Sequence, residues 1–167
     1  MDDKDIKIAF YFEDLMKNVS SGIPEATIFR WRQNAKALGV THLLMIDITT
    51  YQIGQYHNNP DGEVIFERYQ NLSQIEKKYP NFKMVILETP NTLEAKKIKY
   101  QHLPEFKHPK KAIYVVGPDS EPVDLTQGKR DNKFVVIPSD YRNAIWAETA
   151  ISIALYDRFV KTKWQSQ

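Results

Sequence analysis

Four short apolar runs constrain the fold of this chain more than any other feature. They cover residues 40–48, 83–90, 111–117 and 133–138, and each leads into a polar segment. Strands that are buried on both faces are nearly continuously apolar, and helical patterns lie between several of these runs. We therefore expect an α/β protein with a parallel sheet. Because no Pro-, Gly- or Ser-rich linker divides residues 1–167, we expect a single domain.

Helices are predicted between the apolar runs by their spacing and end signals. The first covers residues 24–38, with Pro24 at its start and Gly39 after its end. A shorter helix is predicted around residues 72–79, before Pro80. Residues 6–18 and 64–70 fit either a strand or the start of a helix, and residues 58–62 predict a turn.

A long helix is predicted over residues 144–161, and it is apolar on two flanks. One flank carries Ile145, Thr149, Ile153, Tyr156 and Val160, and the other carries Ala147, Ile151 and Leu155. A stripe this wide exceeds what one face of a sheet can cover. We therefore expect the sheet to bury one flank and a second subunit to bury the other.

Composition excludes several classes of site. The chain has no cysteine, so disulfides and thiolate chemistry are excluded, and its four histidines lack metal-binding spacing. The acidic start, MDDKD, does not match a signal peptide, and no apolar run approaches the roughly 18 residues of a membrane span. We expect a soluble, cytoplasmic protein. Its net charge of +2 does not by itself indicate a nucleic-acid partner.

The second half of the chain carries a series of motifs in a fixed order. Gly117-Pro118-Asp119 ends one apolar run, Ile137-Pro138 ends the next, and the last helix contains Ala154-Leu155-Tyr156-Asp157. They follow the segments NAKALGVTHLLMID and KMVILETP. Over roughly residues 24–160, this order resembles the SPOUT RNA methyltransferases, in particular the branch that methylates ribose 2′-hydroxyls of tRNA and rRNA.

The resemblance implies a fold, a cofactor and an assembly. SPOUT proteins have a parallel α/β sheet with a C-terminal trefoil knot, form homodimers through the knotted region and bind S-adenosylmethionine in the loops after three strands. The implied partner of this chain is RNA, either tRNA or rRNA. The implied cofactor-binding residues are Leu87, Glu88, Gly117, Pro118, Asp119, Ile137, Pro138 and Ile145.

Catalysis is expected to use an arginine of the first helix. The family carries an Arg six residues before the Gly of its first motif, where this chain has Gln33, and Arg30 and Arg32 lie nearby. Successive helical residues are turned by about 100°, so only one of these arginines can face the reaction. The family's Ser-Leu-Asn triplet is replaced by Ala144-Ile145-Trp146, and Asp119 replaces Glu. A non-catalytic relative that binds RNA or cofactor is therefore the second hypothesis.

Other classes are less favoured by the motifs. No G-x-G-x-x-G follows the first apolar run and no P-loop occurs, which argues against an ordinary nucleotide-binding enzyme. Two basic runs with aromatic residues, at 96–100 and 106–111, predict either contact with RNA phosphates or solvated loops.

Overall fold

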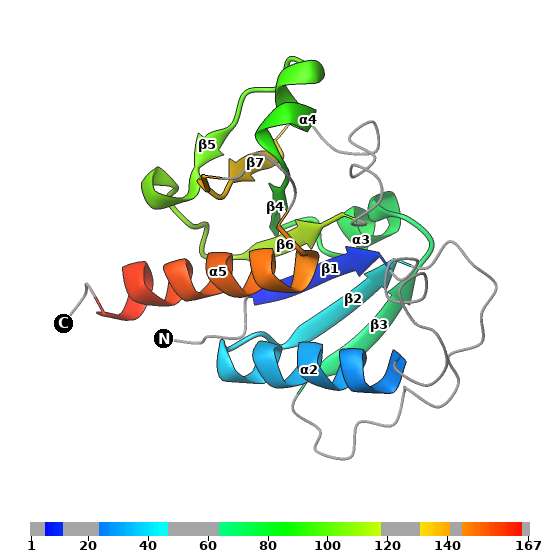
Figure 1. Cartoon of the computed structure of the whole chain (residues 1–167). Helices are drawn as coiled ribbons and strands as arrows, with labels where there is room; N and C mark the ends of the chain where they lie inside the picture. The colour runs from blue at the N-terminus through cyan, green and yellow to red at the C-terminus, as the bar shows by residue number, and fades with distance from the viewer. Residues whose placement is uncertain (1–5, 12–23, 47–63, 118–130, 141–144, 165–167) are drawn as a thin grey trace.

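The sheet that the sequence predicts is present and entirely parallel. The computed structural model describes residues 6–11, 24–46, 64–117, 131–140 and 145–164, and only the backbone of 24–30 and 163–164. Within this part of the chain, seven strands pair in the order β3-β2-β1-β6-β4-β7-β5 (Figure 1). They are β1 (Ile6–Tyr11), β2 (His42–Ile46), β3 (Ile65–Tyr69), β4 (Lys83–Leu87), β5 (Gln101–His102), β6 (Ala112–Val116) and β7 (Lys133–Val136).

Helices cover both faces of the sheet. The helices are α2 (Pro24–Ala37), α3 (Leu72–Lys78), α4 (Pro90–Ala95) and α5 (Ala147–Phe159), with a short 3-10 turn η1 (Leu103–Glu105) and a π-helical turn η3 (Val160–Trp164) after α5. In Figure 1, α2 and α5 lie on the same face and α3 lies on the other. The core on the first face includes Trp31, Ala150, Ile151 and Leu155, whereas Leu72 and Ile75 of α3 lie in the second core.

Most of the predicted elements are confirmed, with three differences. Both ambiguous segments form strands, β1 and β3. The last helix was predicted to begin at residue 144, but it begins at Ala147. Ile145 and Trp146 therefore precede the helix, and the prediction is wrong for these two residues. The sequence predicted neither α4 nor β5. The predicted turn at 58–62 lies outside the described residues.

Strand β7 has an unusual place in the sheet. It pairs with β4 through Leu87 and Val135, and with β5 through His102 and Val136. The chain has therefore already passed through β4, β5 and β6 when it returns to insert β7 between two earlier strands. The segments that would close the predicted knot, 118–130 and 141–144, lie outside the described residues, so the knot stays a prediction.

Helices α2 and α4 end in the same hydrogen-bonded turn. At the end of α2, the Val40 N–H donates to Ala35 and the Gly39 N–H to Lys36, with Gly39 at φ +75°. At the end of α4, the Ile98 N–H donates to Leu93, and the N–H of Lys97 to Glu94. This pattern is the Schellman motif, whose left-handed residue is usually glycine. In α4, Lys97 occupies that position at φ +55°.

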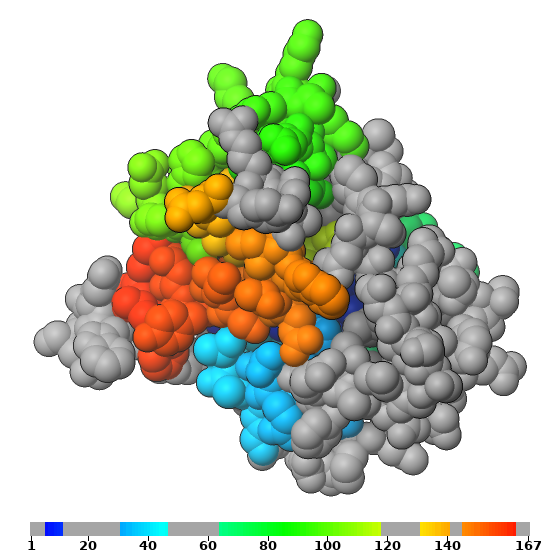
Figure 2. Space-filling view, in the orientation of Figure 1, coloured from blue at the N-terminus to red at the C-terminus, as the bar shows by residue number. Residues whose placement is uncertain are grey.

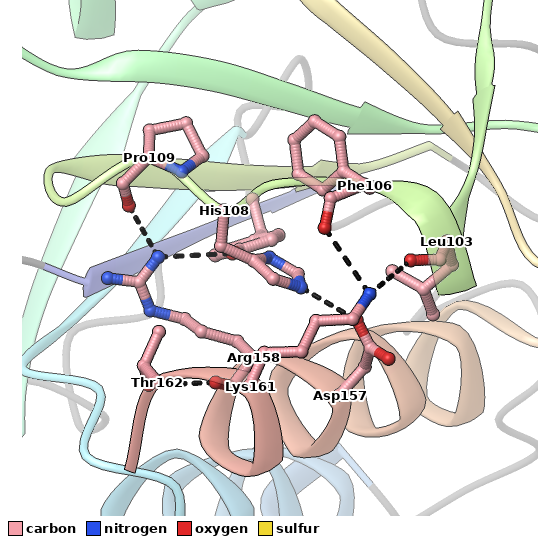
Figure 3. A network of polar contacts seen from close by, with 9 residues as sticks. Leu103, Phe106, His108, Pro109, Asp157, Arg158, Lys161 and Thr162 are labelled. Carbon is pink, nitrogen blue, oxygen red and sulfur yellow. Dashed lines mark hydrogen bonds and ion pairs between the residues drawn. The ribbon is translucent and has the colours of Figure 1, made fainter. Parts of the chain in front are cut away.

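A buried histidine ties the C-terminal part of α5 to the segment before β6. The His108 side chain, only 1% exposed, lies 2.8 Å from the Asp157 carboxylate and 2.6 Å from the Tyr114 hydroxyl (Figure 3). Burial lowers the pKa of His108, although Asp157 opposes that shift. A neutral ring with its proton on Nε2 donates to Asp157 and accepts from Tyr114. Burial also raises the pKa of Tyr114 to about 12, so this hydroxyl stays protonated.

A cation of α5 and one of the following turn η3 bind backbone carbonyls. The guanidinium of Arg158, which is 8% exposed, donates to the carbonyls of Pro109 and Lys110, the latter at 2.9 Å. Lys161 donates to the Leu103 carbonyl at 2.7 Å and also pairs with Asp157 (Figure 3). We call His108, Tyr114, Asp157, Arg158 and Lys161 the α5 latch, because they join α5 to the 103–114 segment.

Candidate functional site

The carboxyl ends of β4, β6 and β7 lie side by side at one edge of the sheet. Leu87 pairs with Val116 of β6 and with Val135 of β7, and the Glu88 N–H donates to the Val135 carbonyl at 3.3 Å. The next residues of β6 and β7, Gly117 and Ile137, stand just beyond the paired strands. Ligands of parallel α/β sheets bind at such carboxyl ends, so these loops form the candidate site.

The candidate site has an apolar base. Leu87 is buried, at 6% exposed, and the half-buried Ile137 and Ile145 pack against the same core. Gly117 is half-buried and Pro138 is exposed. The structure therefore brings the predicted residues Leu87, Gly117 and Ile137 to one region and packs Ile145 against the same apolar core. The predicted residues Pro118 and Asp119 lie outside the described residues.

The loop after β4 is held by side-chain caps. The Glu88 carboxylate accepts the Thr89 N–H at 2.8 Å, and Thr89 Oγ1 accepts the Thr92 N–H at 3.2 Å. Thr89 is thus the N-cap of α4, with Pro90 in its first turn. Sequence analysis missed this cap, although a Thr-Pro pair after an apolar strand is the signal that could have revealed it.

The candidate catalytic arginines lie on α2, away from these loops in the sheet order. Helix α2 packs on β2, and strands β1 and β6 separate β2 from β4. Arg32 is half-buried, Gln33 is exposed, and the side chain of Arg30 lies outside the described part. The role of either arginine therefore stays a prediction.

Ile153 and Tyr156 on the outer flank of α5, and Trp146 just before the helix, are exposed in the single chain, whereas Ile145 is half-buried against the core. Trp146 is 69% exposed, Tyr156 58% and Ile153 38%, whereas Ile151 and Leu155 are buried. The first half of the two-flank prediction is thus confirmed, since the inner flank packs on the sheet. Burial of the outer flank by a second subunit stays a prediction.

A second polar cluster lies at the opposite, amino edge of the sheet. Lys7 is 4% exposed, and its ammonium lies 2.9 Å from His42 Nδ1 and over the rings of Tyr79 and Phe82, at 4.6 and 4.9 Å. Burial and then the Lys7 charge lower the pKa of His42. The two ring faces and the neutral imidazole of His42 thus stabilise the buried ammonium group of Lys7.

Two further observations limit the chemistry of the described part. No three His, Cys, Asp or Glu side chains lie close enough there to hold a metal ion. None of its helices is long and apolar enough to cross a membrane.

Comparison with solved structures identifies the fold. The chain superposes on the TrmH/SpoU tRNA-modifying enzyme of A. aeolicus with a TM-score of 0.63 and 20% identity, over 96% of this chain and 78% of the enzyme. It has the fold of the SpoU/TrmH RNA methyltransferases. The predicted resemblance to the SPOUT methyltransferases is thus confirmed by the similarity of fold. No protein-family profile and no curated protein matches the sequence.

Two other solved structures extend the comparison. A candidate RNA methyltransferase of Bacillus anthracis aligns over 95% of both chains, with a TM-score of 0.65 and 14% identity. The SpoU methyltransferase AviRb of Streptomyces viridochromogenes, solved with its cofactor AdoMet, matches with a TM-score of 0.61 and 13% identity, over 95% of this chain. This chain spans only 61% of that protein.

Proposed function

We propose that the protein binds S-adenosylmethionine and methylates RNA. The observation that carries the proposal is the insertion of β7 between β4 and β5, which places three loop-bearing strand ends together in a fold shared with RNA methyltransferases. The AdoMet complex of AviRb, which has the same fold, supports the choice of cofactor.

The side chains at the three strand ends fit such a cofactor. The half-buried Ile137 offers an apolar surface to the adenine ring, with Leu87 buried at the neighbouring strand end, and Gly117 permits a ligand to approach the backbone closely. Glu88 already bonds to its own loop, which holds the β4 end in place. Pro118, Asp119, Pro138 and Ile145 complete the proposed binding set. When bound, the cofactor would supply an activated methyl group.

We propose a ribose 2′-hydroxyl of tRNA or rRNA as the acceptor, with Arg30 or Arg32 stabilising negative charge on its oxygen. A guanidinium is always charged at neutral pH and can donate to an oxyanion. Only one of the two arginines is assigned this role, because they are turned by about 200° from each other on α2.

Two architectural proposals accompany the reaction. We propose that the C-terminal half is knotted and that all residues belong to one domain, since β7 returns between strands formed earlier. We also propose a homodimer through α5, because Trp146, Ile153 and Tyr156 form an exposed apolar flank. Such a flank is consistent with burial between two copies.

The second candidate function is binding of RNA or cofactor without methyl transfer. Gln33, which matches the position of the family's arginine, is exposed on α2, and Ile145 and Trp146 stand where the family has part of a polar triplet. Loss of one transition-state donor typically lowers the rate by about 10²–10³.

Calorimetric titration with S-adenosylmethionine, followed by a tritiated-methyl transfer assay on tRNA and rRNA, tests the proposal. We expect saturable cofactor binding and alkali-stable incorporation at a ribose. Arg30→Ala and Arg32→Ala separate the two arginines, because only one should abolish transfer while cofactor affinity is kept. Cofactor binding without any incorporation by the parent would favour the second candidate. Failure to bind the cofactor would reject the methyltransferase proposal.

A further inference from the structure

Positive charge is concentrated in the segment that connects β4 to β6. Residues 94–111 contain six lysines and two glutamates, a net charge of +4, whereas the whole chain has a net charge of +2. The rest of the chain is therefore slightly acidic. A basic segment on such a background attracts a polyanion to one place on the surface.

The lysines at the start of this segment are exposed in the connection between α4 and β5. Lys96, Lys97 and Lys99 are all exposed, and they follow α4, which begins directly after the β4 loop. The segment then enters β5, which pairs with β7 just before Ile137. Figure 2 shows the green surface of this region adjoining the amber surface of β7.

Two aromatic rings accompany these cations. The rings of Tyr100 and His102 meet edge to face, with centroids 5.6 Å apart, and His102 is exposed. The Tyr100 hydroxyl donates to Glu94 at 2.9 Å, which fixes the turn that carries the lysines. We call Lys96, Lys97, Lys99, Tyr100 and His102 the basic strip.

The backbone at Lys97 adopts a conformation that usually requires glycine. The equivalent turn of α2 has Gly39 in the left-handed position, where glycine meets no Cβ penalty. The α4 turn makes the same two hydrogen bonds but keeps a lysine at φ +55°. A side chain retained at a strained position points to a role other than stability.

We propose that the basic strip binds the phosphate backbone of RNA and guides it to the loops after β4 and β7. This inference rests on the proposed function and assigns it a contact surface. Lysine ammonium groups on flexible stems suit phosphate contacts that follow shape and not sequence. The ring of His102 offers a face on which an unpaired base can stack.

The test compares two double variants with the same change in charge. Lys96→Glu/Lys99→Glu alters the strip, and Lys77→Glu/Lys78→Glu alters two exposed lysines of α3, on the other face of the sheet. Fluorescence anisotropy with a fluorescein-labelled RNA stem-loop of about 20 nucleotides, titrated without cofactor at several salt concentrations, gives the affinity and its salt dependence. We expect the strip variant to bind roughly tenfold more weakly, with its log–log salt slope reduced by about two. The control should bind within about twofold of the parent.

Lys97→Gly separates charge from folding. Glycine relieves the left-handed strain, so the melting temperature should rise by about 2–4 °C while RNA affinity falls by about threefold. A variant that is at least as stable as the parent but binds RNA more weakly cannot owe that loss to misfolding.

Three results would overturn the proposal. Equal losses in the strip and control variants would show a general charge effect, and unchanged affinity in the strip variants would show that the strip does not bind RNA. A parent that binds no RNA would reject both the strip and the RNA methylation proposal. RNA binding through the strip without any binding of S-adenosylmethionine would reject only the methyltransferase.

Discussion

Replacing Arg158 with methionine tests the role of the α5 latch in stability. Methionine keeps an apolar stem but removes the guanidinium, which donates to the carbonyls of Pro109 and Lys110 and lies 3.4 Å from the Tyr114 hydroxyl. A hydrogen bond from a charged donor contributes about 1.5–3 kcal/mol. We take the lower value for the two carbonyl bonds, because both are only partly buried and water can replace the donor. The expected loss in the free energy of unfolding is about 3 kcal/mol.

Thermal and urea unfolding measure this loss. For a chain of this length, about 3 kcal/mol corresponds to a melting temperature lower by roughly 6–12 °C. Lys107→Met is the matched control, since it removes one exposed lysine of the same segment and should change stability by less than about 0.5 kcal/mol. If Arg158→Met loses no more stability than Lys107→Met, the Arg158 bonds do not contribute to holding α5 to the 103–114 segment.

Acidification, a glycine substitution and a tryptophan substitution test three other parts of the structure. The pKa values of His42 and His108 are lowered in the folded state, so below a pH of about 6.5 the unfolded chain binds more protons than the folded one. The free energy of unfolding, measured by urea titration, should therefore fall between pH 7 and pH 5, by up to about 1.4 kcal/mol per pH unit for each histidine. A free energy of unfolding that stays constant over this range would contradict both assignments. Gly117→Val should prevent calorimetric binding of S-adenosylmethionine by filling the space beside the backbone, and parent-like affinity would mean that the pocket lies elsewhere. Trp146→Glu should turn the proposed dimer into a monomer in sedimentation at tens of micromolar, and a parent that is itself monomeric there would reject the interface.

The strands were predictable where burial leaves an uninterrupted apolar run. β4 and β6 are such runs. Every residue of β6 is buried, and so is every residue of β4 except the first, Lys83. β1 was ambiguous because Lys7 interrupts it, and the contacts that allow this lysine to be buried come from Tyr79 and Phe82, more than seventy residues away in the sequence. Such long-range contacts leave no periodic pattern within a single segment.

The candidate site was predictable in part, because the ends of the apolar runs mark the ends of the strands. Strand ends place Leu87, Gly117 and Ile137 together once the sheet is known to be parallel. α4 was missed because it has only six residues and because Lys97 stands where a terminal glycine would mark its end. β5 has two residues and exists only through its pairing with β7, so no local pattern could reveal it.

The late arrival of β7 also has a consequence for synthesis on the ribosome. β4 and β5 precede β7 by more than thirty residues, yet β7 is the strand that joins them. A nascent chain that has emerged only as far as β6 must therefore leave β4 with one open edge and β5 without its ladder partner. Open strand edges pair readily with other chains. Pauses in translation before residue 133 should make this protein more dependent on chaperones than pauses after it.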